Sequence, residues 1–115
     1  MKSIPRVSFL AACLALVLAA CTPTPVPEDK LSYVGEWKSD TRSLRIDREG
    51  HVSYKRDDGG VQSSVNAPIK AFVGDDFEVG MGPIKTTFVV NQVPREDSNG
   101  WSMVVDGATL RKTSN

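Results

Sequence analysis

Residues 44–55 read Leu-Arg-Ile-Asp-Arg-Glu-Gly-His-Val-Ser-Tyr-Lys, and this stretch decides the fold class. Leu44 and Ile46 alternate with charged residues, and after a break Val52 and Tyr54 alternate in the same way with Ser and Lys. An alternation with period two is typical of a half-buried strand. The intervening residues 47–50 combine charge with glycine, as tight turns do. The stretch therefore predicts two antiparallel strands joined by a turn.

The same pattern continues on both sides of this stretch. Tyr33, Gly35 and Trp37 share one face of a predicted strand, and Val61 and Val65 share a face of another. Further strands are expected at residues 69–73, 77–80, 84–90, 101–106 and 108–111. Turn sequences rich in Gly, Asp and Asn separate them at short intervals, and the polar residues 94–100 read as a loop. Since helical spacing is absent after the N-terminal segment, the sequence predicts an all-β domain of seven to nine short strands.

The predicted strands need an arrangement that covers the edges of their sheet. An antiparallel meander does this by closing into a barrel or by folding into two packed sheets. We expect a small barrel, closed or nearly closed, over residues 31–115, with a sandwich as the alternative. The aromatic residues that we expect to fill its interior lie on different predicted strands: Trp37, Tyr54, Phe72, Phe77, Phe88 and Trp101.

The first twenty residues have the layout of an export signal. Lys2 and Arg6 precede an apolar run over 7–18, which at about twelve residues is shorter than the roughly twenty that span a bilayer as a helix. The run ends in Leu18-Ala19-Ala20-Cys21, which resembles the lipobox of bacterial lipoproteins. The resemblance implies cleavage before Cys21, a diacylglycerol group on its sulfur and acylation of the new amino terminus. The alternative is that Cys21 is only the first residue of a secreted, unmodified protein.

The resemblance also implies an address. In bacteria with two membranes, Asp after the lipidated cysteine commonly marks retention at the inner membrane, whereas Thr22 stands here. We therefore expect a lipid-anchored protein of the bacterial envelope, at the outer membrane. Cys13 lies in the apolar run and Cys21 takes the lipid, so no free thiol is expected in the mature chain.

Residues 21–30 are expected to form a proline-rich tether. Prolines at 23, 25 and 27 favour the polyproline II conformation, in which the nine residues after Cys21 would span about 28 Å. This is long enough to lift a domain clear of the lipid headgroups. A proline-rich ligand for a recognition groove is the alternative interpretation.

A second resemblance concerns Gly35-Glu36-Trp37. The triplet resembles the Gly-x-Trp motif of lipocalins and related small barrels, in which the tryptophan closes the base of the barrel and a basic residue of the last strand packs across it. The resemblance implies a lipocalin-like barrel with structural roles for Trp37 and for Arg111 as the basic partner.

Few residues suggest chemistry. His51 is the only histidine and reads as a solvated residue at a strand start. Asp57-Asp58 precedes Gly59-Gly60 as in a hairpin turn and lacks the spaced carboxylates of a calcium loop. The segment 74–83 pairs acidic residues with a glycine-rich turn, so Asp75, Asp76 and Met81 are the candidate partner surface, although chance placement explains them nearly as well. No metal or cofactor is expected.

The charge balance and the lack of a catalytic motif argue against several classes of function. Without Lys2 and Arg6 the basic residues number 12 against 14 acidic ones, which argues against nucleic acid as a partner. We favour a membrane-anchored lipoprotein whose non-catalytic β domain is an interaction or accessory module for another envelope protein. The alternative is a carrier of a small apolar or lipid ligand, or a lipocalin-like inhibitor module, which needs a cavity of about 300 Å³ or more. An enzyme is least favoured, because no nucleophile, base and orienting group can be proposed together.

Overall fold

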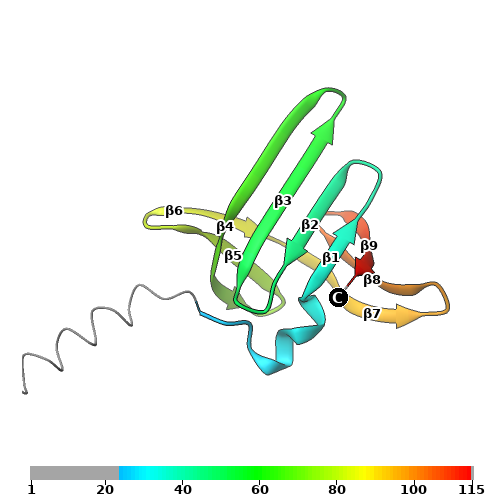
Figure 1. Cartoon of the computed structure of the whole chain (residues 1–115), viewed down its shortest axis with the longest axis horizontal. Helices are drawn as coiled ribbons and strands as arrows, with labels where there is room; N and C mark the ends of the chain where they lie inside the picture. Colours follow the sequence, from blue (N-terminus) through cyan, green and yellow to red (C-terminus); the bar gives the residue numbers. More distant parts are fainter. Residues whose placement is uncertain (1–23, 115) are drawn as a thin grey trace, which may run out of the picture.

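The computed structural model describes residues 24–114, and they form an all-β domain. Nine antiparallel strands make one strongly curled sheet, a half-barrel, in the order β6-β5-β4-β3-β2-β1-β9-β8-β7 (Figure 1). The all-β, barrel-like meander is confirmed. The predicted signal peptide, Cys21 and the first residues of the predicted tether lie outside the described residues. The strands are β1 (Gly35–Lys38), β2 (Arg42–Ile46), β3 (His51–Asp58), β4 (Val61–Val73), β5 (Asp76–Met81), β6 (Ile84–Phe88), β7 (Val90–Asp97), β8 (Gly100–Val105) and β9 (Ala108–Ser114).

Residues 44–55 form most of the β2–β3 hairpin. Leu44 lies opposite Tyr54 and Ile46 opposite Val52, and all four side chains are buried. The Asp47 carboxylate closes the turn by accepting a hydrogen bond from the backbone N–H of His51 at 2.9 Å. Residues directly opposite each other in a sheet point to the same face, so the hairpin presents one continuous apolar surface.

Strand β4 joins two parts of the sheet, where the sequence predicted two separate strands. Its first part, to Pro68, pairs with β3, and its second part, from Ile69, pairs with β5. The register shifts between Ile69 and Ala71, and such a bulge bends a strand and increases its twist. The β5–β6 hairpin consequently runs across the direction of β3 in Figure 1.

Two predictions were wrong in the region of strand β7. Residues 84–90 form no single strand, and most of the residues read as a polar loop belong to β7 or β8. Strands β6 and β7 are the two edges of the sheet, which explains the composition of β7, because edge strands carry charge, bulges and proline. Pro94 and two register shifts in its pairing with β8 match this position.

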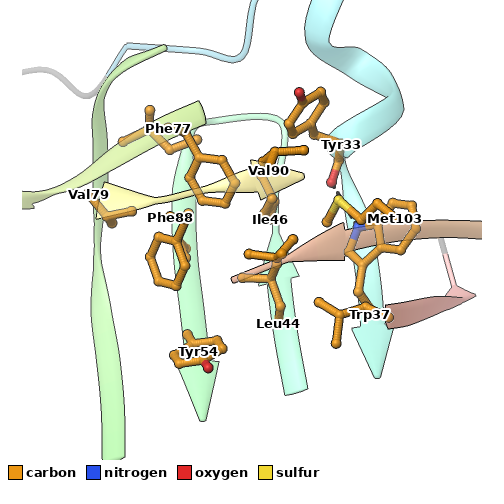
Figure 2. Packing of buried hydrophobic residues seen from close by; sticks show 14 of the residues in the cluster. Tyr33, Trp37, Leu44, Ile46, Tyr54, Phe77, Val79, Phe88, Val90 and Met103 are labelled. Carbon is orange, nitrogen blue, oxygen red and sulfur yellow. Dashed lines mark hydrogen bonds between the residues drawn. The ribbon is translucent and has the colours of Figure 1, made fainter. Parts of the chain in front are cut away.

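The core fills the concave side of the half-barrel. Figure 2 shows Phe77 and Phe88 of the β5–β6 hairpin facing residues of β2 and β3. The Phe77 and Phe88 rings stack with centroids 5.0 Å apart, and Tyr54 meets Phe88 edge-on at 5.1 Å. Of the six aromatic residues expected inside, Trp37, Tyr54, Phe77 and Phe88 are buried, whereas Phe72 and Trp101 are partly buried against the core.

Trp37 is fully buried, but its basic partner is not the predicted one. Lys112 Nζ lies 4.9 Å from the Trp37 ring centroid and 5.3 Å from that of Trp101, whereas Arg111 is exposed. Lys112 is paired with Trp37 in the sheet and therefore shares its face, whereas Arg111 lies opposite Lys38 on the other face. Burial lowers the pKa of Lys112. The prediction that Arg111 is the basic partner of Trp37 is therefore wrong by one residue. A shift of one residue moves a side chain to the other face of a strand.

The chain ahead of β1 packs on the domain. Val26 is buried, and its backbone N–H donates a hydrogen bond to the Arg48 carbonyl at 3.0 Å. A short 3₁₀ helix, η1 (Glu28–Tyr33), follows, although no helix was predicted, and it delivers the buried Tyr33 to the core. Within residues 24–114, no helix has the length and apolar character needed to cross a bilayer.

Candidate functional site

The residues predicted as one partner surface lie at opposite ends of β5. Asp75 and Asp76 stand at the β4–β5 turn, and Met81 is the last residue of β5. Asp76 and Met81 are five positions apart along extended strand, about 17 Å at 3.4 Å per residue. The structure therefore does not bring these three residues together, and the two ends are considered separately.

Asp75 and Asp76 hold neighbouring segments in place. The Asp75 carbonyl accepts a hydrogen bond from the Tyr33 hydroxyl at 2.8 Å, and its carboxylate lies 3.9 Å from Lys30 Nζ. The Asp76 carboxylate accepts a 2.8 Å hydrogen bond from the backbone N–H of Val90, the first residue of β7. Burial, and then the charges of Asp75 and Asp76, raise the pKa of Tyr33 to about 12. These contacts give the acidic pair a structural role at the base of the hairpin.

At the other end of β5, the hairpin tip (residues 81–84) exposes apolar side chains. Met81 and Ile84 lie directly opposite each other, with exposed fractions of 67% and 76%. They continue the face of Val79 and Phe88 beyond the core. Lys70 of β4 supports the tip, since its Nζ donates a 2.5 Å hydrogen bond to the Gly82 carbonyl. Exposed apolar side chains that adjoin one another mark contact surfaces more often than single ones do.

A small apolar groove lies beside Lys70. Residues 24–27 and residues 69–72 of β4 enclose about 250 Å³ between them. This volume is below the 300–1,000 Å³ of typical small-molecule sites. The groove marks the place where the N-terminal segment meets β4, next to the hairpin tip.

A larger cleft, here called the distal cleft, lies at the far end of β2 and β3. It holds about 630 Å³ between the β1–β2 turn, the end of β3 and the start of β4. Its lining combines hydroxyl side chains, Asp40, Asp57 and four cationic residues: Lys38, Arg42, Lys55 and Arg56. Figure 1 shows this end of the sheet, with the β3–β4 turn, pointing away from η1.

The cations of the distal cleft are crowded. Arg42 lies directly opposite Arg56 in the β2–β3 ladder, and like charges in this position repel each other. Arg56 pairs with Asp58. Among residues 24–114, Lys38, Arg42 and Lys55 make no ion pair within 4.0 Å. Four cations and two carboxylates line the cleft, which therefore carries an excess of positive charge together with hydroxyl groups, a combination that favours an anionic group.

The distal cleft was not predicted, although the pairing that places its two arginines opposite each other can be read from the sequence. If the alternating apolar residues pair as Leu44 with Tyr54 and Ile46 with Val52, counting outward places Arg42 opposite Arg56. The cationic crowding follows from that register alone.

The other suggestive residues have structural surroundings. His51 begins β3 as an exposed residue, with its Nε2 2.6 Å from the Asn66 side-chain oxygen. The Asp57 carboxylate accepts a hydrogen bond from the Gly60 N–H at 3.1 Å, which is the predicted hairpin role. In the part of the chain that the structure describes, no three His, Cys, Asp or Glu side chains gather as a metal site would require.

Comparisons of the chain with protein-family models, with curated proteins and with solved structures give no match.

Proposed function

We propose that the protein is a lipid-anchored lipoprotein of the bacterial outer membrane whose β domain binds an acidic segment of another envelope protein in the distal cleft. The domain is an interaction module, and the proposal assigns it no catalytic step. The placement of Arg42 directly opposite Arg56, in a cleft whose lining carries an excess of positive charge, is the observation that carries this proposal.

The position of the cleft supports the proposal. Residues 24–26 contact the β2–β3 turn, where Val26 bonds to Arg48, whereas the cleft lies at the other end of the same strands. Six residues from His51 to Asp57 separate the two ends, about 20 Å along β3. A domain anchored through its N-terminal segment therefore turns the cleft away from the membrane, toward other proteins.

The energetics also favour an acidic partner. An anionic segment in the cleft would relieve the repulsion between Arg42 and Arg56 and pair with cations that the fold leaves without carboxylates. Such charge complementarity raises association rates and weakens as ionic strength rises, because the Debye length is only about 8 Å at 0.15 M salt. Binding should therefore fall as salt is increased.

The proposal is tested by site-specific photo-crosslinking of the full-length protein in its host. A photoreactive residue at Gln62, in the lining of the cleft, should crosslink to a defined envelope protein. The double charge reversal R42E/K55E should abolish that crosslink. The matched control R45E/R48E changes two exposed arginines outside the cleft and should keep it. Equal crosslinking in both variants would reject the cleft as the binding site.

A further inference from the structure

The lipid on Cys21 can lie only a short distance from the domain. The described chain begins at Thr24, and the lipidated residue of the proposed function is Cys21. Three residues span at most about 11 Å even when fully extended. Residues 24–26 are already held on the domain, since Val26 is buried and a Cβ on Gly50 would stand 2.2 Å from the Thr24 carbonyl oxygen. The anchor therefore keeps the adjoining face of the domain close to the headgroups, not 28 Å above them.

The face of the domain next to the anchor includes the apolar groove and the hairpin tip. Thr24 and Pro25 border the apolar groove together with Lys70 of β4. Lys70 in turn donates its hydrogen bond to Gly82 in the hairpin tip. Lys70 thus borders the groove at residues 24 and 25 and also holds the tip that exposes Met81 and Ile84.

The chemistry of the tip suits the bilayer interface. Met81 and Ile84 are the two most exposed large apolar side chains of the β5–β6 hairpin, and Lys70 and Lys85 flank them with positive charge. Lys85 is paired with Glu78 at 3.3 Å, whereas Lys70 has no carboxylate within ion-pair distance among the described residues. Apolar side chains that enter the interface beside cations that meet anionic headgroups are typical of peripheral membrane contacts.

We infer that the hairpin tip, residues 81–84, is a membrane-contact site that rests in the headgroup region of the bilayer that holds Cys21. The inference rests on the lipid anchor of the proposed function and adds a second, non-covalent contact to it. The anchor brings residues 24–26 close to the headgroups, and the contact of the tip fixes how the domain is rotated about that point.

The test uses the lipidated mature protein in vesicles of phosphatidylethanolamine and phosphatidylglycerol. The variant M81C introduces a free thiol for an environment-sensitive fluorophore, because Cys21 is acylated and Cys13 is removed with the signal peptide. V61C is the matched control: Val61 is 69% exposed and lies at the β3–β4 turn, far from the anchor. I84C provides a second labelled position in the tip. Mass spectrometry of each sample verifies the lipid on Cys21.

The inference predicts that labels at 81 and 84 are quenched by nitroxide on the acyl chains and shielded from aqueous iodide. The label at 61 should show the opposite response. A lipidated protein whose labels at 81 and 61 are equally open to iodide would overturn the inference and leave the anchor intact. Shielding at 81 from both quenchers would also overturn it, because a protein surface would then cover the tip. An unmodified Cys21 would overturn the anchor and this inference together.

Discussion

Replacing Asp76 by alanine tests the role that the structure gives to the acidic pair. The Asp76 carboxylate accepts the Val90 N–H at 2.8 Å in a partly buried position. Val90 begins an edge strand and has no partner strand on the side of β6, so this carboxylate is the acceptor that its N–H has in the structure. The substitution removes the acceptor and leaves the donor in place.

The expected cost follows from the unpaired donor. A partly buried N–H without an acceptor costs about 1–3 kcal/mol in the free energy of unfolding, and a hydrogen bond to a charged group lies in the same range. For a domain of this size each kcal/mol lowers Tm by about 4–8 °C. Asp76→Ala should therefore lower Tm by at least about 4 °C.

Urea unfolding of the signal-free protein measures the change in the free energy of unfolding, and thermal unfolding measures the change in Tm, both followed by tryptophan fluorescence. Asp75→Ala is the matched control, because the Asp75 side chain is 61% exposed and its 3.9 Å pair with Lys30 is worth about 0–1 kcal/mol at most. Asp76→Asn keeps an acceptor oxygen and should lose less stability than Asp76→Ala. If Asp75→Ala and Asp76→Ala cost the same, the hydrogen bond to Val90 does not stabilise the fold and the reasoning is wrong.

Three further predictions concern the core and the hairpin. Trp37→Ala should cost about 3–5 kcal/mol, because a fully buried indole leaves a cavity; calorimetry showing under 1 kcal/mol would contradict the core position. Gly80→Ala should destabilise the domain by about 1–3 kcal/mol in urea unfolding, since its Cβ would lie 2.1 Å from the Ile84 carbonyl oxygen; an unchanged midpoint would refute that close approach. Tyr33 has its pKa raised from 10.0 to about 12, so its contribution to stability is complete below pH 10 and is lost as the pH rises toward 12. Tyr33→Phe should remove that part of the alkaline loss, and parallel stability curves for the two proteins from pH 9 to 12 would exclude the phenol as its cause.

Sequence patterns predicted the strands that have one buried face and one exposed face. The β2–β3 hairpin shows this well, because alternation and turn residues agree on one register. Strand β7 was missed because an edge strand carries the proline and charge that otherwise mark a loop. The bend of β4 depends on a bulge between Ile69 and Ala71, which is set by packing against β5 and has no local signal.

Residues of the candidate sites could be predicted where local sequence determines them, but not where strand pairing does. Local chemistry identified the β4–β5 turn and the glycine-rich tip as features, but the length of β5 that separates them follows only from the observed pairing. The basic residue over Trp37 was misplaced by one position, because the pairing of β1 with β9 has a register shift between Glu36 and Trp37. The distal cleft joins residues of β1, β2, β3, β4 and the β1–β2 turn, and apart from the pairing of Arg42 with Arg56 only the three-dimensional arrangement brings them together.

The place of β9 beside β1 affects how this domain can fold. Read from β7, the strand order β7-β8-β9-β1-β2-β3-β4-β5-β6 is a plain up-and-down meander, interrupted only between β9 and β1, which no hairpin connects. Strands β1 and β9 are about 70 residues apart in sequence, so their pairing closes a long loop and raises the contact order of the domain. The sheet cannot become continuous until β9 is available, so the fold of this domain is completed only after β9 has been synthesised. A circular permutant of the domain that is opened at Val89, with a linker from β9 to β1, would contain only hairpin neighbours and should fold faster than the native order.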